Sequence, residues 1–182
     1  MGRGSLRLSL TFLLLGGAAW GQIPTSIDSD QIPKYRVLRP GLAVGAQPSP
    51  EALASLKEKG FKTVVNLRTA AEGPATEKDV VEAQGLRYVS VPISPSTFSE
   101  EDVQAVAKVL DDTEAAPVLL HCASANRVGA VWAVLRVKQG LSLDEAEAAG
   151  REIGLSGPPM IEAMRRVAAS FRHQTAFPGA RS

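Results

Sequence analysis

The sequence brings a thiol and a guanidinium close together in one short segment. Cys122 is the only cysteine of the chain, and four residues separate it from Arg127. The run 118–120, which leads into His121 and Cys122, is apolar like a buried strand, and an apolar helix is expected to begin near Arg127. Ligands of open α/β sheets bind beyond the carboxyl end of a strand, so this loop is the first candidate for a functional site.

The loop has the features of an anion-binding site. A helix start offers unpaired backbone N–H groups and the positive end of the helix dipole. Small side chains let that backbone approach an oxyanion closely, and Arg127 adds a planar fork of donors that fits two oxygens of a phosphate or sulfate. We therefore expect the substrate to be bound by Ala123, Ser124, Ala125, Asn126 and Arg127.

Cys122 and its neighbour His121 each allow two interpretations. A helix start favours the charged form of a thiol, so we expect Cys122 to have more thiolate character than a free cysteine. A thiolate that faces a bound oxyanion is a nucleophile with its electrophile in place. The alternative is that Cys122 is a small core residue at a strand end. His121 either tunes the thiol or packs and hydrogen-bonds at the strand end.

Short apolar runs alternate with segments of helical period from residue 41 onward. We expect strands at 42–45, 62–66, 87–91 and 117–121, and helices at 50–59, 75–84, 100–110, 128–139, 143–152 and 158–171. Strands that alternate with helices predict an α/β fold of three layers, in which a mostly parallel central sheet is flanked by helices on both faces.

The first residues have the pattern of an export signal. Arg3 and Arg7 give a positive start, residues 8–15 are apolar, and Ala19 to Gly21 form a small-x-small cleavage site. We expect residues 1–21 to be a signal peptide and the protein to be periplasmic or secreted. An uncleaved anchor is the alternative, but the apolar run is shorter than a membrane-spanning helix, so no stable membrane insertion is expected after cleavage.

The rest of the chain suits one domain. Residues 22–40 contain three prolines and predict an extended arm, residues 41–172 a single domain, and residues 173–182 a flexible tail. The 20 basic and 19 acidic residues nearly cancel and the basic ones are scattered, so nucleic acid is not an expected partner. A lone cysteine excludes an internal disulfide. We expect neither a metal nor a cofactor.

The motifs resemble a known superfamily. His121-Cys122 and Arg127 are similar to the signature of protein tyrosine and dual-specificity phosphatases. The segments 44–49, 60–68 with Glu72, and 121–130 resemble more closely the bacterial phosphatase-like domain of beta-lactamase-hydrolase-like proteins, over residues 35–155. The resemblance implies a cysteine-phosphatase fold, Cys122 as the nucleophile that forms a phosphocysteine, and Arg127 on the phosphoryl oxygens. It also implies a phosphorylated protein or a small phosphoester as the substrate.

The loop departs from that signature in its length and in two residues. Phosphatase loops of the common kind have five residues between cysteine and arginine, whereas this loop has four. Ala125 replaces the usual loop glycine, and Val128 replaces the hydroxyl residue that often follows the arginine. Four residues is also the spacing of many single-domain rhodaneses. A rhodanese-like sulfurtransferase and a catalytically weak, anion-binding pseudophosphatase are therefore the alternative functions.

The sequence leaves the general acid open. Phosphatases usually take an aspartate from a loop after an earlier strand, but residues 91–96 contain no carboxylate. Glu72 lies in a loop at the same expected sheet edge as Cys122, so it is our candidate for an acid. Arg68 either extends the anion site or pairs with Glu72. Glu100, Glu101 and Asp102 are expected to serve the first turn of a helix.

Overall fold

The computed structural model describes residues 22–175, with the backbone alone for residues 172–175. The expected signal peptide at 1–21 and residues 176–182 of the expected tail lie outside the described residues. Among residues 22–175, no helix is both long enough and apolar enough to cross a membrane.

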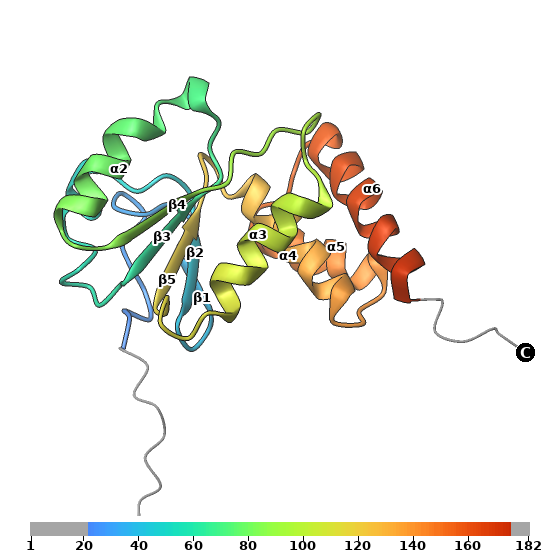
Figure 1. The fold of residues 1–182 in the computed structure, drawn as a ribbon, viewed down its shortest axis with the longest axis horizontal. Helices are drawn as coiled ribbons and strands as arrows, with labels where there is room; N and C mark the ends of the chain where they lie inside the picture. Colours follow the sequence, from blue (N-terminus) through green and yellow to red (C-terminus); the bar gives the residue numbers. More distant parts are fainter. Residues whose placement is uncertain (1–21, 176–182) are drawn as a thin grey trace, which may run out of the picture.

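A sheet of five strands forms the centre of the domain (Figure 1). Its order is β1-β2-β5-β3-β4. β1 pairs with β2 in antiparallel fashion, and the other neighbours are parallel. The strands are β1 (Arg36–Arg39), β2 (Leu42–Gly45), β3 (Thr63–Asn66), β4 (Arg87–Ser90) and β5 (Val118–His121). β2, β3 and β5 are buried along their whole length, as parallel strands covered on both faces should be.

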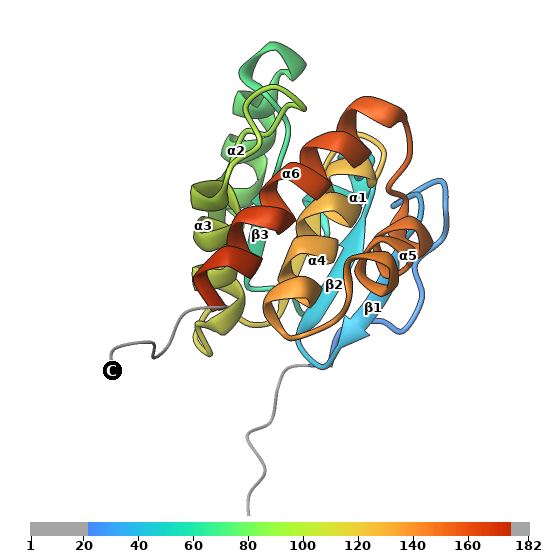
Figure 2. The ribbon, with the colours of Figure 1, turned by 90° about the vertical axis from the view of Figure 1, so that its right-hand side faces the viewer.

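Helices cover both faces of the sheet, which confirms the expected three-layer α/β fold. One apolar cluster joins one face to α1 (Pro50–Ala54) and α2 (Pro74–Ala83). A larger cluster joins the other face to α3 (Glu100–Asp111), α4 (Asn126–Lys138), α5 (Leu143–Ile153) and α6 (Pro158–Thr175). Figure 2 shows α4, α5 and α6 over this second face. A short 3-10 helix, η1 (Ala70–Glu72), precedes α2.

Two of the expected elements differ from the structure. The expected arm at 22–40 ends in β1, and within it Ile32 is fully buried in the core beside α1. β1 is an edge strand with two arginines, so its sequence lacks the apolar run of a central strand. The helix expected at 50–59 ends at Ala54, because the Ser55 hydroxyl donates to the carbonyls of Glu51 and Ala52 and competes with the next helical turn.

Candidate active site

The loop that follows β5 lies at the carboxyl edge of the parallel strands. The register places Gly45 of β2, His121 of β5 and Asn66 of β3 side by side at this edge. α4 begins at Asn126, within the loop, so its first N–H groups face the same edge as Cys122. The strand, the loop and the helix thus have the order that the sequence predicted.

Side chains alternate between the two faces of the sheet at the end of β5. Leu120 and Cys122 belong to the core cluster on the α4 side, whereas Leu119 belongs to the cluster on the α1 and α2 side. His121 contacts Glu77 of α2, so it lies on that second side. Cys122 and His121 are both fully buried. The nucleophile candidate and the histidine before it therefore have different surroundings.

The loop backbone is held by residues from distant parts of the chain. The carbonyl of Ala123 accepts from the Gln47 N–H at 3.3 Å, and that of Ser124 accepts from the Lys34 ammonium at 3.1 Å. Asn126 accepts from the Ser156 N–H through its Oδ1 at 2.8 Å. Ala123 and Ser124 are exposed, as an entrance to the loop requires.

Ala125 adopts a conformation that usually belongs to glycine. Its φ of 66° lies in the left-handed region, where a non-glycine residue is uncommon. Gly154 packs against it so closely that an added Cβ would lie 3.1 Å from the Ala125 Cβ. Ala125 thus stands where the phosphatase signature has a glycine, and it adopts a left-handed backbone that glycine favours. The absence of a side chain at Gly154 leaves room for the Ala125 methyl group.

Arg127 is fixed by Glu72 through two hydrogen bonds. Its Nη1 lies 2.7 Å from Glu72 Oε2, and its Nη2 lies 2.6 Å from Glu72 Oε1. Nη1 also donates to the carbonyls of Leu67 and Ile93, each at 3.2 Å. The pKa of Arg127 is raised, first by its hydrogen bonds to Glu72 and also by the Cys122 side chain. The guanidinium is therefore charged, held in one plane, and close to Cys122.

Glu72 was our candidate for a general acid, but its contacts make it the partner of Arg127 instead. Its hydrogen bonds with Arg127, and next those with Thr69, lower the pKa of Glu72 to about 2 against the opposing effect of burial. The Thr69 N–H and hydroxyl both donate to Glu72 Oε2 at 2.8 Å. A carboxylate that is ionised at neutral pH has no proton to donate, so in this arrangement Glu72 holds Arg127.

Arg68 points to the opposite side of the sheet edge from Cys122. Its Nη1 donates to Gln47 Oε1 at 2.6 Å and to Glu77 Oε2 at 3.2 Å, and its Nη2 donates to the main-chain carbonyl of Glu72. The expected pairing of Arg68 with Glu72 thus involves only the backbone of Glu72. The ion pair of Arg68 is with Glu77, a residue that the sequence did not single out.

Glu77 forms a buried polar cluster that sequence reasoning missed. Its carboxylate contacts His121, Asn66, Gln47 and Arg68. Burial by itself raises the pKa of Glu77, but the hydrogen bonds and charges of these neighbours outweigh it and place that pKa below its usual range. The sequence held one indication of its burial: Glu77 lies four residues before the apolar Val81, so the two share the inner face of α2.

Asp102 caps the start of α3, as expected for an acidic residue in the first turn of a helix. Asp102 accepts from the Ser99 N–H at 3.0 Å, and Ser99 accepts from the Asp102 N–H, so the two form a capping box. In the preceding loop, the hydroxyls of Ser94, Ser96 and Thr97 bond to one another rather than to a carboxylate. The loop 91–98 therefore offers no carboxylate that could serve as a general acid.

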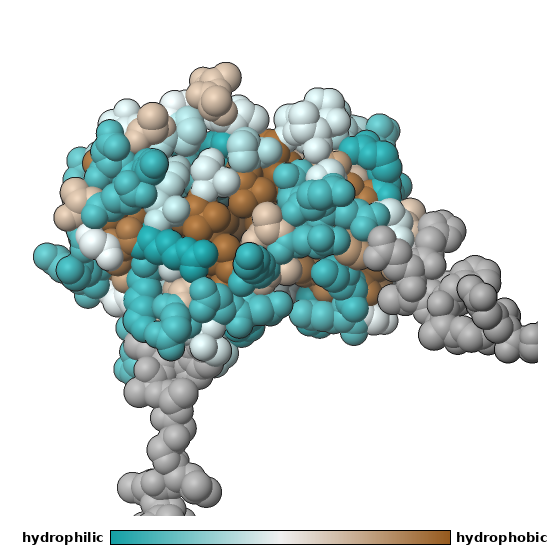
Figure 3. Space-filling view, in the orientation of Figure 1, coloured by the Kyte–Doolittle hydropathy of each residue, from teal (hydrophilic) through white to brown (hydrophobic). Residues whose placement is uncertain are grey.

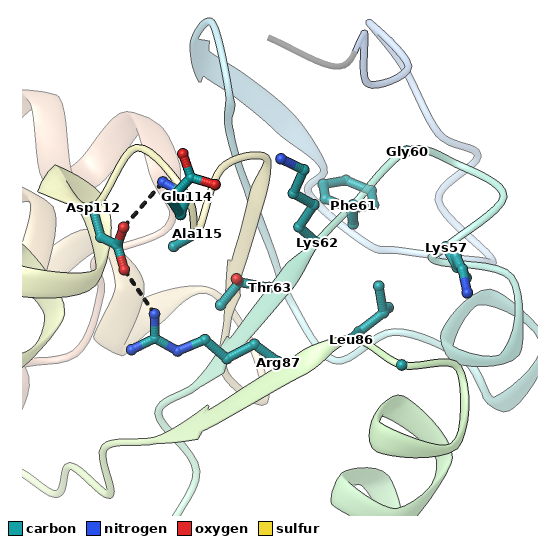
Figure 4. A pocket seen from close by; sticks show the side chains of 11 residues that line it. Lys57, Gly60, Phe61, Lys62, Thr63, Leu86, Arg87, Asp112, Glu114 and Ala115 are labelled. Carbon is teal, nitrogen blue, oxygen red and sulfur yellow. Dashed lines mark hydrogen bonds and ion pairs between the residues drawn. The ribbon is translucent and has the colours of Figure 1, made fainter.

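A hollow of about 510 Å³ lies at the amino-terminal edge of the strands, away from Cys122. Lys62, Thr63 and Arg87 line it, and Arg87 pairs with Asp112 (Figure 4). It is at the far edge of the sheet from the loop. The loop, with its fixed arginine, is therefore a better candidate for chemistry than this hollow.

The face drawn in Figure 3 is largely hydrophilic, with apolar residues gathered near its middle.

Solved structures of phosphatases share this fold. TpbA of P. aeruginosa, in complex with phosphotyrosine, has a TM-score of 0.62 and 22% identity, and the match covers 87% of this chain and 97% of that one. The core catalytic domain of the PP-IP phosphatase SIW14 of S. cerevisiae, in complex with citrate, has a TM-score of 0.62 and 15% identity over 79% of this chain and 91% of that one. The fold is that of the cysteine phosphatases.

Sequence comparison identifies the family. A family model described as "DSP-PTPase phosphatase fused to NAD+ Kinase" matches residues 22–166. The chain therefore belongs to this phosphatase family, and its class is that of the tyrosine and dual-specificity phosphatases, which are hydrolases.

Curated relatives confirm the resemblance found in the motifs. The beta-lactamase hydrolase-like protein of Xylella fastidiosa is 31% identical over 119 residues, which are 62% of this chain and 27% of that protein. The protein of the same name from Agrobacterium fabrum is 27% identical over 142 residues, which are 75% of this chain and 33% of that protein. The chain spans about a third or less of the length of these relatives.

Proposed function

We propose that the protein hydrolyses a phosphoester by nucleophilic attack of Cys122. The observation that carries the proposal is the guanidinium of Arg127, which Glu72 fixes with two hydrogen bonds beside Cys122 and at the first turn of α4. A charged fork, helix N–H groups and a thiol at one point are the parts that a bound phosphoryl group needs.

The reaction takes place in two displacement steps. The Cys122 thiolate attacks phosphorus, so the S–P bond forms while the P–O bond to the leaving group breaks. Water then attacks the phosphocysteine, the S–P bond breaks, and inorganic phosphate leaves with the thiolate regenerated. Arg127 and the loop N–H groups bind the phosphoryl oxygens in both steps and stabilise the charge that develops on them.

Glu72 serves this reaction by holding Arg127. Both of its carboxylate oxygens accept from that arginine, and its low pKa keeps it ionised. We assign no general acid, because the loop 91–98 has no carboxylate. The leaving oxygen then departs with its negative charge and takes a proton from water afterwards, so substrates with acidic leaving groups are favoured.

The site and the structural neighbours support a phosphoester as the substrate class. TpbA was solved with phosphotyrosine, and SIW14 is a phosphatase of PP-IP. A phosphorylated protein and a small phosphoester both present the same phosphoryl group to the loop. An aryl phosphate is the better first substrate, because a phenol leaves without a proton donor more readily than an alcohol does.

Turnover by wild-type protein and a Cys122→Ser variant tests the function. We expect the wild type to release phosphate from an aryl phosphate, and Cys122→Ser to lose nearly all turnover while it still binds phosphate. Unchanged turnover in the variant contradicts the assignment of the nucleophile. The same preparations are assayed with thiosulfate and cyanide, where sulfur transfer without phosphate release indicates a sulfurtransferase. Phosphate binding without either activity indicates a pseudophosphatase.

A further inference from the structure

Glu77 of α2 is a buried carboxylate that contacts His121, the residue before Cys122, and the proposed reaction does not use it. It is only 4% exposed, and a charge in the protein interior is costly unless it is fully paired. Its partners come from three other parts of the chain: the residue before Cys122, the segment after β2, and the end of β3, which leads to Glu72. We propose that Glu77 is a positioning residue that fixes His121, the loop backbone and, through Arg68, the Glu72 segment that holds Arg127.

The carboxylate is saturated with donors. Glu77 Oε1 lies 2.7 Å from His121 Nε2 and 3.0 Å from Asn66 Nδ2. Oε2 lies 2.8 Å from Gln47 Nε2 and 3.2 Å from Arg68 Nη1. All four partners therefore point a donor at one ionised group. A neutral side chain of the same shape cannot replace it, because an amide brings a donor where only acceptors fit.

The first connection fixes the histidine before the nucleophile. Because an ionised Glu77 only accepts hydrogen bonds, it holds a proton on His121 Nε2 and fixes the ring orientation. His121 Nδ1 is buried and has no hydrogen-bond partner among the described residues. A ring anchored on one side only depends on that anchor, so the orientation of His121 rests on Glu77.

The second and third connections reach the loop and the arginine. Gln47 donates its side-chain amide to Glu77 and its backbone N–H to the carbonyl of Ala123, inside the loop. Arg68 donates to Glu77 and to the main-chain carbonyl of Glu72, whose carboxylate holds Arg127. One buried group thus supports the segments that present the nucleophile, the loop N–H groups and the guanidinium.

This inference rests on the proposed function, but its test does not depend on turnover alone. The test compares Glu77→Gln with Glu147→Gln in the full chain. Glu147 is a matched control, since it is also a buried carboxylate of a helix, 6% exposed, and pairs with Arg151 and Arg165 at 2.8 Å. It lies on α5 and has no contact with the cluster around Glu77.

Two measurements report on positioning rather than on folding. Cys122 is the only cysteine, so the concentration of inorganic phosphate that halves its alkylation by iodoacetamide measures binding at the loop. The chain has two histidines, and isotope labelling with a His173→Gln variant for assignment reports the ring protons of His121 by NMR. Both are recorded well below the melting temperature of each variant, together with kcat/KM for an aryl phosphate.

We expect Glu77→Gln to lower kcat/KM and phosphate protection by about 10-fold or more, by analogy with carboxylates that orient metal-binding histidines, whose loss costs about 10- to 100-fold. In the wild type we expect the short hydrogen bond to Glu77 to shift the His121 Nε2 proton downfield, and Glu77→Gln should remove that shift. Glu147→Gln should leave all three readouts near wild type. Equal effects of the two variants, or an unchanged His121 signal, overturn the positioning role.

The result also separates this inference from the proposed function. Wild-type protein that binds phosphate without turnover contradicts the function, while the comparison of phosphate protection still decides the role of Glu77. Wild-type protein whose Cys122 is not protected by phosphate contradicts both.

Discussion

At the scale of single residues, Glu72 links the stability of the site to pH. Its pKa is lowered from 4.5 to about 2, chiefly by hydrogen bonds from Arg127. The folded state therefore favours the ionised form, and this contribution is fully present above pH 4.5 and is lost as the pH falls toward 2. We predict that Glu72→Gln lacks this part of the pH dependence.

The measurement is urea unfolding of wild type and Glu72→Gln between pH 7 and pH 2. The difference in unfolding free energy should be constant near neutral pH and shrink below the ordinary pKa of a glutamate, 4.5. A difference that stays constant down to pH 2 contradicts the ionised pair with Arg127.

The pairing of Glu72 also changes what is expected for leaving groups. A general acid that protonates the leaving group typically accelerates a reaction about 10²- to 10⁴-fold, and without one the departing oxygen carries a negative charge. We predict a steep dependence of kcat/KM on the acidity of the leaving alcohol, with aryl phosphates cleaved and alkyl phosphates nearly inert. Glu72→Gln should be slower with every substrate but should keep the slope of wild type.

A series of substituted phenyl phosphates measures that slope. A steeper slope in Glu72→Gln means that Glu72 does protonate the leaving oxygen, as the sequence alone suggested. A flat dependence in both proteins points to another acid, for which Glu100, Glu101 and Asp102 at the start of α3 are the nearest carboxylates in sequence.

Local and distant contacts explain which site residues the sequence could predict. Cys122 and Arg127 lie on one loop, so their spacing is visible in the sequence. Glu72 was placed at the correct sheet edge, but its bond to Arg127 joins residues 55 positions apart, and no spacing rule predicts such a pair. The contact of Glu77 with His121 spans 44 positions and was missed for the same reason.

At the scale of elements, the close crossing of α4 and α5 supports the loop. A Cβ added to Gly129 of α4 would lie 2.4 Å from the Gly150 carbonyl and 2.7 Å from the Leu155 N–H nitrogen. Leu155 follows Gly154, which touches Ala125 of the loop. We predict that Gly129→Ala lowers the unfolding free energy by about 1–3 kcal/mol and also lowers kcat/KM.

Gly140→Ala is the control for that substitution. Gly140 follows α4 with a φ of 99°, and a Cβ added there would meet no atom within 4 Å, so alanine encounters backbone strain but no neighbour. It should cost about 1–2 kcal/mol and leave kcat/KM unchanged. Chemical denaturation and aryl phosphate kinetics check both variants, and full activity in Gly129→Ala contradicts the support of the loop by this crossing.

The elements themselves were predicted mostly from periodicity and caps. The central strands and the helices α2 to α5 begin and end near their expected positions, because apolar runs and Ser99 mark them locally. α6 begins at Pro158 as expected, but it continues to Thr175, so residues 173–175 of the expected tail are helical. β1 was missed because its pairing with β2 gives little signal in a polar edge strand. The sheet order was not predicted, since it depends on contacts between strands far apart in sequence.

At the scale of the whole molecule, the sequence predicts export. Residues 1–21 have the charge, apolar run and small-x-small site of a signal peptide. We predict that full-length protein expressed in a bacterium is recovered from the periplasm or the medium with Gln22 as its first residue. N-terminal sequencing of the recovered protein checks this, and protein that keeps Met1 and stays with the membrane fraction supports the uncleaved anchor instead.

We propose that Cys122 carries the phosphoryl group during turnover. Rapid acid quenching of wild-type protein with an aryl phosphate, followed by mass spectrometry of the peptide that contains Cys122, tests this. We predict phosphate on Cys122 in the wild type and no phosphate on the corresponding peptide of Cys122→Ser. Phosphate release by the wild type with an unmodified Cys122, or with phosphate on a different residue, contradicts the claim.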